Sequence, residues 1–141
     1  MTSEEKSAWI MGVVAVATYG IYLSTIFSLA DGPLYEVAYA WPMAWTIIGA
    51  IIVSIVLHIL AAAIWPKDAN KRDTRDKEIS RFGDFVGSGL VSAGAVAAMI
   101  LAMLEWDLFW IANVIYLGFM LSAVVATVAK VVAYRGGFQR W

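Results

Sequence analysis

The sequence predicts an all-α integral membrane protein with four transmembrane helices. Of its 141 residues, 62% are hydrophobic and only 15% are charged, which leaves a soluble fold too little polar surface to cover its core. Four apolar stretches are also long enough to cross a hydrocarbon layer, a distance that takes about 20 helical residues. In addition, basic side chains avoid two of the three connections between these stretches, as expected for a multi-pass topology.

The four predicted spans form a single transmembrane domain over residues 1–141. Backbone polar groups in lipid must be satisfied within their own segment, so the spans are predicted to be helices and not strands. The spans cover residues 9–30, 42–65, 85–104 and 109–134, and a charged connector covers residues 66–84.

The first two spans each carry polar side chains. In the first, Thr18, Tyr22 and Thr25 recur at positions i, i+4 and i+7 and predict a polar stripe on one side. The second contains His58, the only histidine, and an ionisable group inside a membrane is by default a functional candidate. A neutral imidazole that bonds a neighbouring helix is the favoured interpretation. Proton or ligand chemistry at His58 stays open, and bis-histidine haem ligation within one chain is excluded.

The connector over residues 66–84 holds six basic and five acidic side chains, which is more than half of the charges in the chain. Opposite charges four residues apart stabilise a helix, so the connector is predicted to extend the third span below the membrane. One interpretation is a solvated elbow that sets the topology. The other is a docking surface for a cytoplasmic partner or anionic lipid. Its candidate residues are Asp73, Arg75, Asp76, Lys77 and Arg81.

The third span is rich in small residues, which let membrane helices approach closely. Two series stand out, Gly83-xxx-Gly87 and Gly89-xxx-Ala93-xxx-Ala97. We therefore expect this span at the centre of the bundle or at an oligomer interface. In the fourth span, Lys130 lies near the cytoplasmic end, and its long stem is expected to carry the charge out to the headgroups.

The stretch from Asp73 to Ile79, Asp-Thr-Arg-Asp-Lys-Glu-Ile, resembles an Asp-Glu-Arg-Asp-x-x-Ile signature. That signature marks a family of small, uncharacterised bacterial and archaeal four-helix membrane proteins. The resemblance covers about half of the chain, and Thr74 stands where the family has glutamate. It implies the four-helix fold and the plasma membrane of a prokaryote, the inner membrane in a Gram-negative cell. It implies no activity, because the family has none established.

Basic residues predict the orientation, since they stay on the cytoplasmic side. Nine of the ten follow the second span, in the connector or in and after the fourth span, and none lies in the other two connections. Those two connections carry Asp31 and Glu36, and Glu105 and Asp107. We expect both termini and the connector to be cytoplasmic and the two acidic turns to lie outside.

A shift of 69 positions suggests an internal duplication of a two-helix unit. It aligns Glu36 with Glu105 and Trp41 with Trp110, so that each Glu-x4-Trp falls in an outer turn. Such a duplication is a parallel repeat about an axis along the membrane normal. Paired carboxylates among aromatic rings could hold a cation. The plainer interpretation is an interfacial belt of tryptophan and tyrosine.

Several chemistries are excluded or lack a motif. The chain has no cysteine, and no phosphate-binding loop, nucleophile elbow, zinc motif or calcium loop occurs. We expect no enzyme activity, no metal and no cofactor, and the net charge of −1 predicts no nucleic-acid partner. The predicted function is binding within the bilayer, as an accessory subunit, a homo-oligomer or the membrane partner of a cytoplasmic regulator. The alternative is a small oligomeric cation transporter or channel that uses Glu36, Glu105 and His58.

Overall fold

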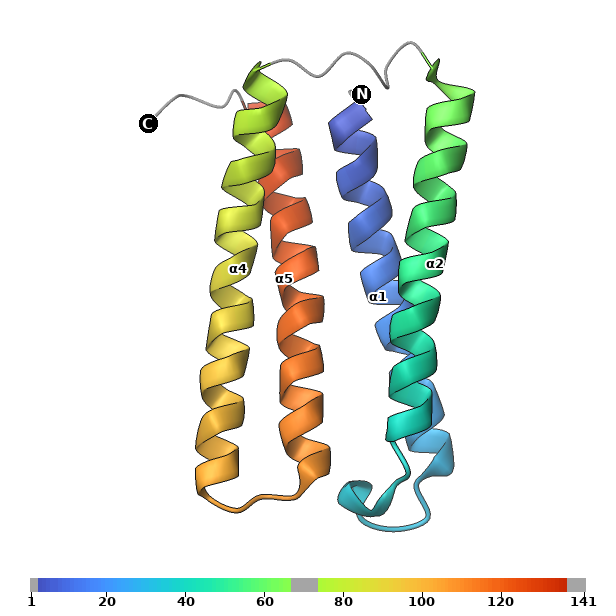
Figure 1. The fold of residues 1–141 in the computed structure, drawn as a ribbon, viewed down its shortest axis with the longest axis vertical. Coiled ribbons are helices and arrows are strands. Elements are labelled where there is room, and N and C mark those ends of the chain that lie inside the picture. The colour runs from blue at the N-terminus through green and yellow to red at the C-terminus, as the bar shows by residue number, and fades with distance from the viewer. Residues whose placement is uncertain (1–2, 67–73, 137–141) are drawn as a thin grey trace.

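The computed structural model describes residues 3–66 and 74–136, and every long element in these two ranges is a helix. The elements are α1 (Ser3–Leu29), the short 3-10 helix η1 (Leu34–Glu36), α2 (Ala40–Ile64), α4 (Thr74–Met103) and α5 (Leu108–Gly136) (Figure 1). Four of them are long and apolar enough to cross a membrane. The prediction of an all-α chain with four such helices is confirmed.

The helix α4 begins well before the predicted span. Its first residue is Thr74, whereas the apolar stretch starts at Phe85. The extra turns are stabilised by packing, because Asp76 and Ile79 are buried against the rest of the chain. The part of the connector from Thr74 onward therefore is the helical extension that the alternating charges predict, and residues 67–73 lie outside the described residues.

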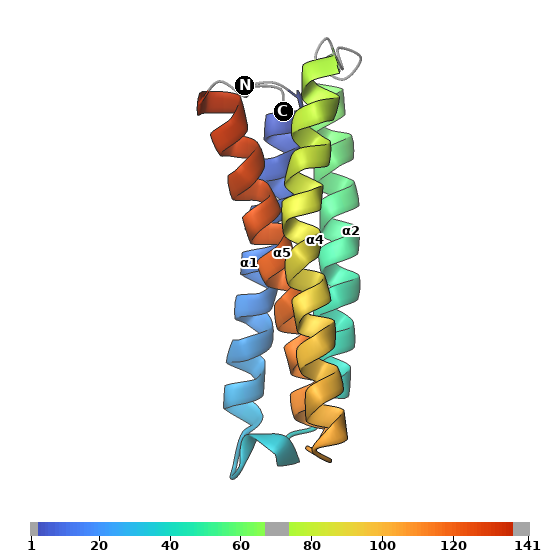
Figure 2. The ribbon, with the colours of Figure 1, turned by 90° about the vertical axis from the view of Figure 1, so that its left-hand side faces the viewer.

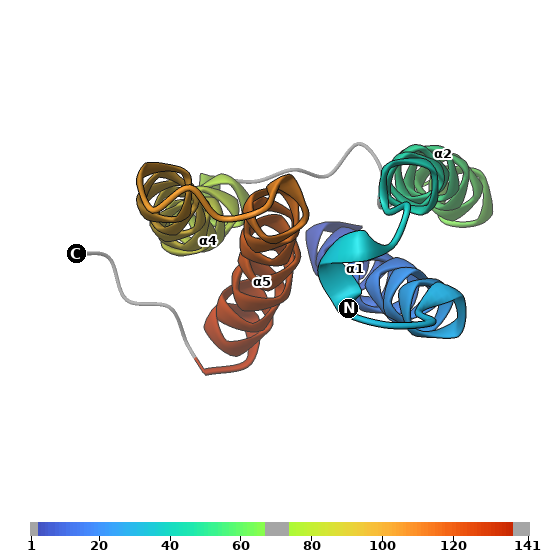
Figure 3. The same cartoon turned by 90° about the horizontal axis from the view of Figure 1, so that it is seen from below.

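The four helices form an open row and not a closed bundle. Seen from the end that carries the turns, the order is α4, α5, α1, α2 (Figure 3). The main helix interfaces are α4 with α5, α5 with α1, and α1 with α2. The start of α1 and the end of α5 lie together at the end of the molecule opposite the two turns (Figures 1 and 2). Because α5 and α1 are the inner helices, the third span does not lie at the centre of the bundle, and its alternative place at an oligomer interface stays a prediction.

Glycines bring α4 and α5 into close contact. A Cβ built on Gly94 would lie 3.2 Å from the Cα of Gly118, and one on Gly87 would lie 2.8 Å from the carbonyl oxygen of Ser122. Gly89 has no neighbouring atom within 4 Å. The first predicted series of small residues therefore packs on α5, whereas the second begins on the exposed side of α4.

Contacts between α1 and α5 join the two hairpins. Near one end, the hydroxyl of Thr127 donates to the carbonyl of Ala8 over 3.0 Å. Near the turns, Tyr22 is fully buried and packs with Ile26, Val37 and Phe109. Its hydroxyl donates to Oδ1 of Asn113 over 2.6 Å, so one tyrosine of the predicted polar stripe forms the centre of the apolar core.

Candidate functional site

Acidic side chains at the start of α4 turn toward α5. Asp76 is only 6% exposed, and its Oδ1 accepts a hydrogen bond from the hydroxyl of Tyr134 over 3.0 Å. Two turns later, Oδ1 of Asp84 accepts from the ammonium of Lys130 over 2.7 Å. Charge-assisted contacts of this kind are among the stronger hydrogen bonds in proteins. Both carboxylates thus hold α4 against α5.

Lys130 packs against α4. The residue is 8% exposed, and its stem crosses the backbone of Gly83, where a Cβ would collide with the Cγ of Lys130. The missing side chain at Gly83 therefore makes room for the stem, and Asp84 on the next residue receives the charge. The sequence alone did not identify this acceptor on the neighbouring helix, and the position of the charge relative to the headgroups stays a prediction.

A third carboxylate ties α1 to this cluster. Glu5 is 7% exposed, and its Oε1 lies 3.4 Å from Nε of Arg135 on α5. Beside it, the ammonium of Lys6 lies 4.1 Å above the ring centre of Trp65 at the end of α2, a distance that suits a cation–π contact. At the ends of the helices opposite the two turns, contacts of charged groups therefore involve all four helices.

Basic side chains at the start of α4 face outward. Arg75, Lys77 and Arg81 are exposed, and none forms an ion pair with a residue in the described ranges. Lys77 and Arg81 are four residues apart and so share one side of the helix, while Arg75 points to the other flank. We call Lys77 and Arg81 the basic face of α4.

The five candidate partner-binding residues therefore separate. Arg75, Lys77 and Arg81 are on the surface, Asp76 is buried against α5, and Asp73 lies outside the described residues. The fold thus separates the buried Asp76 from the exposed basic candidates. Asp76 contributes to the packing of α4 on α5, whereas the three basic candidates are exposed.

His58 links two helices. Its Nδ1 lies 2.6 Å from the carbonyl oxygen of Ser54, one turn earlier on α2. Since a carbonyl only accepts, Nδ1 carries a proton, and Nε2 shares a hydrogen bond of 2.6 Å with the hydroxyl of Ser7 on α1. Both ring nitrogens are satisfied within the chain, which matches the favoured structural interpretation.

The candidate carboxylates Glu36 and Glu105 lie at the end of the molecule that carries the two turns. Glu36 closes η1, which packs on α5, and Glu105 lies in the turn just before α5. Both are exposed, as is Trp41, while Trp110 is partly buried between the rings of Phe109 and Trp106. The two carboxylates therefore share one end, as the proposed alignment requires.

His58 does not belong to the same site as these carboxylates. Along α2 it lies 18 residues beyond Ala40, the first residue of the helix, which is about 27 Å at the rise of an α-helix. Glu36 precedes that first residue. A single site built from Glu36, Glu105 and His58 is thus not formed within one chain.

Glu105 has an unusual backbone conformation. Its φ is 56°, the only positive value among the non-glycine residues described. The amide of Trp106 bonds the carbonyl of Leu101, and the amide of Glu105 bonds that of Ala102. This is the pattern that ends a helix with a left-handed residue, a position where glycine is preferred.

Three structural partners were missed by reading the sequence alone. Asn113 accepts a hydrogen bond from Tyr22, Ser7 is hydrogen-bonded to His58, and Tyr134 donates a hydrogen bond to Asp76. Asn113 offered a signal, because an amide within an apolar span needs a partner in lipid. Ser7 and Tyr134 offered none, since each lies near a helix end where a polar group is ordinary.

In the described ranges, no group of three or more histidine, cysteine, aspartate or glutamate residues is placed to hold a metal ion. Searches of family models, curated proteins and solved structures found no match to this chain.

Proposed function

We propose that this chain is a non-enzymatic, multi-pass membrane protein that acts by binding, as an accessory subunit or as the membrane partner of a cytoplasmic regulator. One observation carries the proposal. Asp76 and Asp84 are engaged by α5, which leaves Lys77 and Arg81 exposed and without an ion pair in the described ranges. An exposed basic face at the membrane boundary attracts an acidic partner surface.

The proposed orientation places both termini and the basic face in the cytoplasm. It is supported by the absence of basic residues from the two turns. The start of α1 and the end of α5 also share one end of the row (Figure 1). The resemblance in residues 73–79 favours the plasma membrane of a prokaryote.

The two-helix unit, α1 with α2 and α4 with α5, is proposed to have arisen by duplication. Each unit is a hairpin whose turn lies at the same end of the row (Figure 1). In an oligomer, the exposed sides of α2 and α4 would be the surfaces left for a second copy.

The test is isolation of the protein from its native membrane with its partner. Charge reversal of the basic face, Lys77→Glu with Arg81→Glu, should remove the partner because like charges then meet across the contact. Arg75→Glu is the matched control, since it makes the same change on the other flank of the same helix. It should keep most of the partner.

Two outcomes would contradict the proposal. The first is a partner that stays bound to the doubly reversed variant while the protein keeps its melting temperature. The second is that the reversal removes anionic phospholipid, measured by mass spectrometry of the purified protein, and no protein. That result would make the basic face a lipid surface.

A second candidate function, cation binding at the outer turns, is favoured by Glu105. A glutamate at φ 56° occupies a position that glycine fills at lower cost, so the carboxylate is kept there against the local preference. With Glu36 at the same end, it offers two like charges, which a cation would hold together.

This candidate is tested by thermal unfolding with inorganic and quaternary ammonium cations. A ligand that binds only the folded state raises the melting temperature. Glu36→Gln or Glu105→Gln alone should remove most of that rise, and the double variant should remove little more. If no cation shifts the wild-type melting temperature, the two carboxylates are ordinary surface groups.

A further inference from the structure

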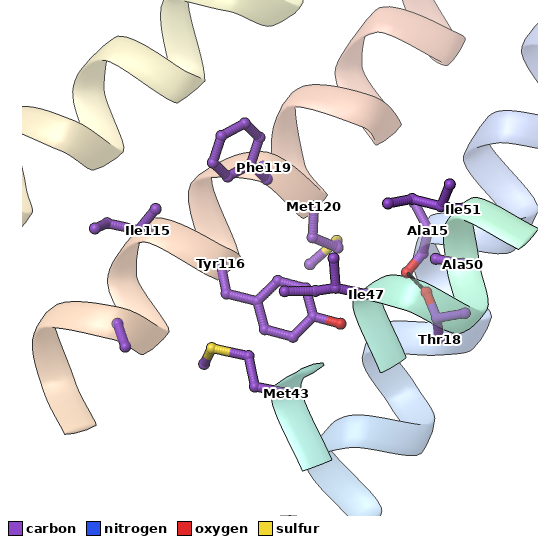
Figure 4. Close-up of a pocket in the computed structure, with 11 residues that line it drawn as sticks. Ala15, Thr18, Met43, Ile47, Ala50, Ile51, Ile115, Tyr116, Phe119 and Met120 are labelled. Atoms are coloured by element: carbon purple, nitrogen blue, oxygen red, sulfur yellow. Dashed lines mark hydrogen bonds between the residues drawn. The ribbon is translucent and has the colours of Figure 1, made fainter. Parts of the chain in front are cut away.

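An apolar groove lies between α2 and α5 and is floored by α1. Its volume is about 390 Å³, within the range of roughly 300–1,000 Å³ found for small-molecule sites. On α2 it is lined by Ile47, Ala50 and Ile51, and on α5 by Ala112, Tyr116 and Phe119, among others. Figure 4 shows the ring of Tyr116 reaching from α5 toward α2.

The two hydroxyls that line the groove have their donor hydrogens engaged within the chain. The hydroxyl of Thr18, on the α1 floor, donates to the carbonyl of Val14 over 2.7 Å. The hydroxyl of Tyr116 donates to Oγ1 of Thr46 over 3.0 Å. Because both lining hydroxyls are already satisfied, recognition here rests on shape and dispersion. The occupant is therefore apolar along its whole bound length.

The groove runs along α2. Its α2 wall runs from Met43 to Ile51, which is about 12 Å at the helical rise. A groove of this volume and length suits a single hydrocarbon chain lying along α2.

The position of the groove along α2 matches the thickness of one leaflet. It extends from about 5 to about 17 Å beyond Ala40, the start of α2, and half of a hydrocarbon layer is about 15 Å. The rim residues Ile51 and Phe119 are more than half exposed, so the groove opens toward lipid. We propose that it binds one acyl chain of a phospholipid from the leaflet beside the two turns.

The test uses purified protein in phosphatidylglycerol and phosphatidylethanolamine vesicles. A fraction of the phosphatidylglycerol carries a photoactivatable diazirine at the middle of one acyl chain. After illumination, mass spectrometry should find several-fold more lipid adduct at Ile51 than at Val96 of α4. These two side chains are equally exposed, at 55% and 56%, so annular lipid alone would label them alike.

A filling variant provides the second measurement. Ala50→Phe places a ring in the groove and should lower the adduct at the remaining lining residues several-fold. Ala95→Phe is the matched control, on an exposed site of α4 at similar depth, and should leave the adduct unchanged. If Ala50→Phe does not fold, Ala112→Leu fills the same groove from α5.

Three results would overturn the proposal. One is equal labelling of Ile51 and Val96 in the wild type. Another is an adduct that persists in a folded filling variant. The third is an intermolecular disulfide formed by Ile51→Cys, in a chain without other cysteines, because it would place a second copy over the groove.

Discussion

The ammonium of Lys130 lies 2.7 Å from Oδ1 of Asp84, and the two ends of this ion pair differ in exposure. The lysine side chain is 11% exposed and the aspartate side chain 63%. Water solvates the carboxylate if the pair is broken, whereas the buried ammonium has no such replacement. The lysine is therefore the member that depends on the pair.

The first prediction concerns this dependence. Asp84→Ala should lower the free energy of unfolding by about 1–2 kcal/mol, because it leaves a buried charge without its acceptor. Lys130→Met should cost less, since it removes the charge and keeps an apolar stem over Gly83. The double variant should resemble Lys130→Met in detergent unfolding. Equal and additive costs would show that the two residues are not coupled.

A second prediction compares two glycines of α4. Gly94→Ala should destabilise the protein by about 1–3 kcal/mol, because the new Cβ would lie 3.2 Å from the Cα of Gly118. Gly89→Ala meets no atom within 4 Å and should stabilise the helix by about 0.5–1 kcal/mol. Melting temperatures of the two variants measure the difference, and shifts of the same sign would refute the close contact between α4 and α5 at Gly94.

The third prediction concerns Glu105. Glu105→Gly should raise the free energy of unfolding by about 0.5–1 kcal/mol, because glycine adopts a positive φ without a steric cost. Glu105→Ala keeps the strain and serves as the control, so it should give no gain. Thermal unfolding in one detergent compares the three proteins, and a Glu105→Gly variant no more stable than Glu105→Ala would argue against the left-handed turn.

The fourth prediction concerns topology. The chain has no cysteine, so single cysteines report their own location. Gly32→Cys, in the first turn, should react with a membrane-impermeant maleimide added to intact cells. Ala69→Cys, in the connector, should react only after the membrane is opened. The reverse pattern would invert the orientation.

The helices could be predicted from the sequence, but their neighbours could not. Length and hydropathy locate the spans, because lipid demands both. The same hydropathy says nothing about burial, since lipid tails are as apolar as leucine. Thus α2 is the most apolar of the four spans and has no buried residue, while α5, with Asn113 and Lys130 in its sequence, packs on both α4 and α1.

The candidate residues could be predicted by type, and their roles could not. Asp76 and Lys77 are adjacent in the sequence and equally charged in magnitude, yet one is buried and the other exposed. The difference comes from Tyr134, which lies 58 residues away from Asp76. A local charge pattern cannot predict a partner so far away in the sequence. His58 was the easier case, because a polar side chain within an apolar span needs a hydrogen-bond partner.

The position of α5 in the row has a consequence for synthesis. Ribosomes deliver spans to the membrane in chain order, so α1 enters lipid well before α5 exists. Until then the hydroxyl of Tyr22 lacks Asn113, and Thr127 has not yet reached the carbonyl of Ala8. The side of the first hairpin that packs on α5 is therefore uncovered until α5 arrives, and the packing of the described helices is completed only with this last one.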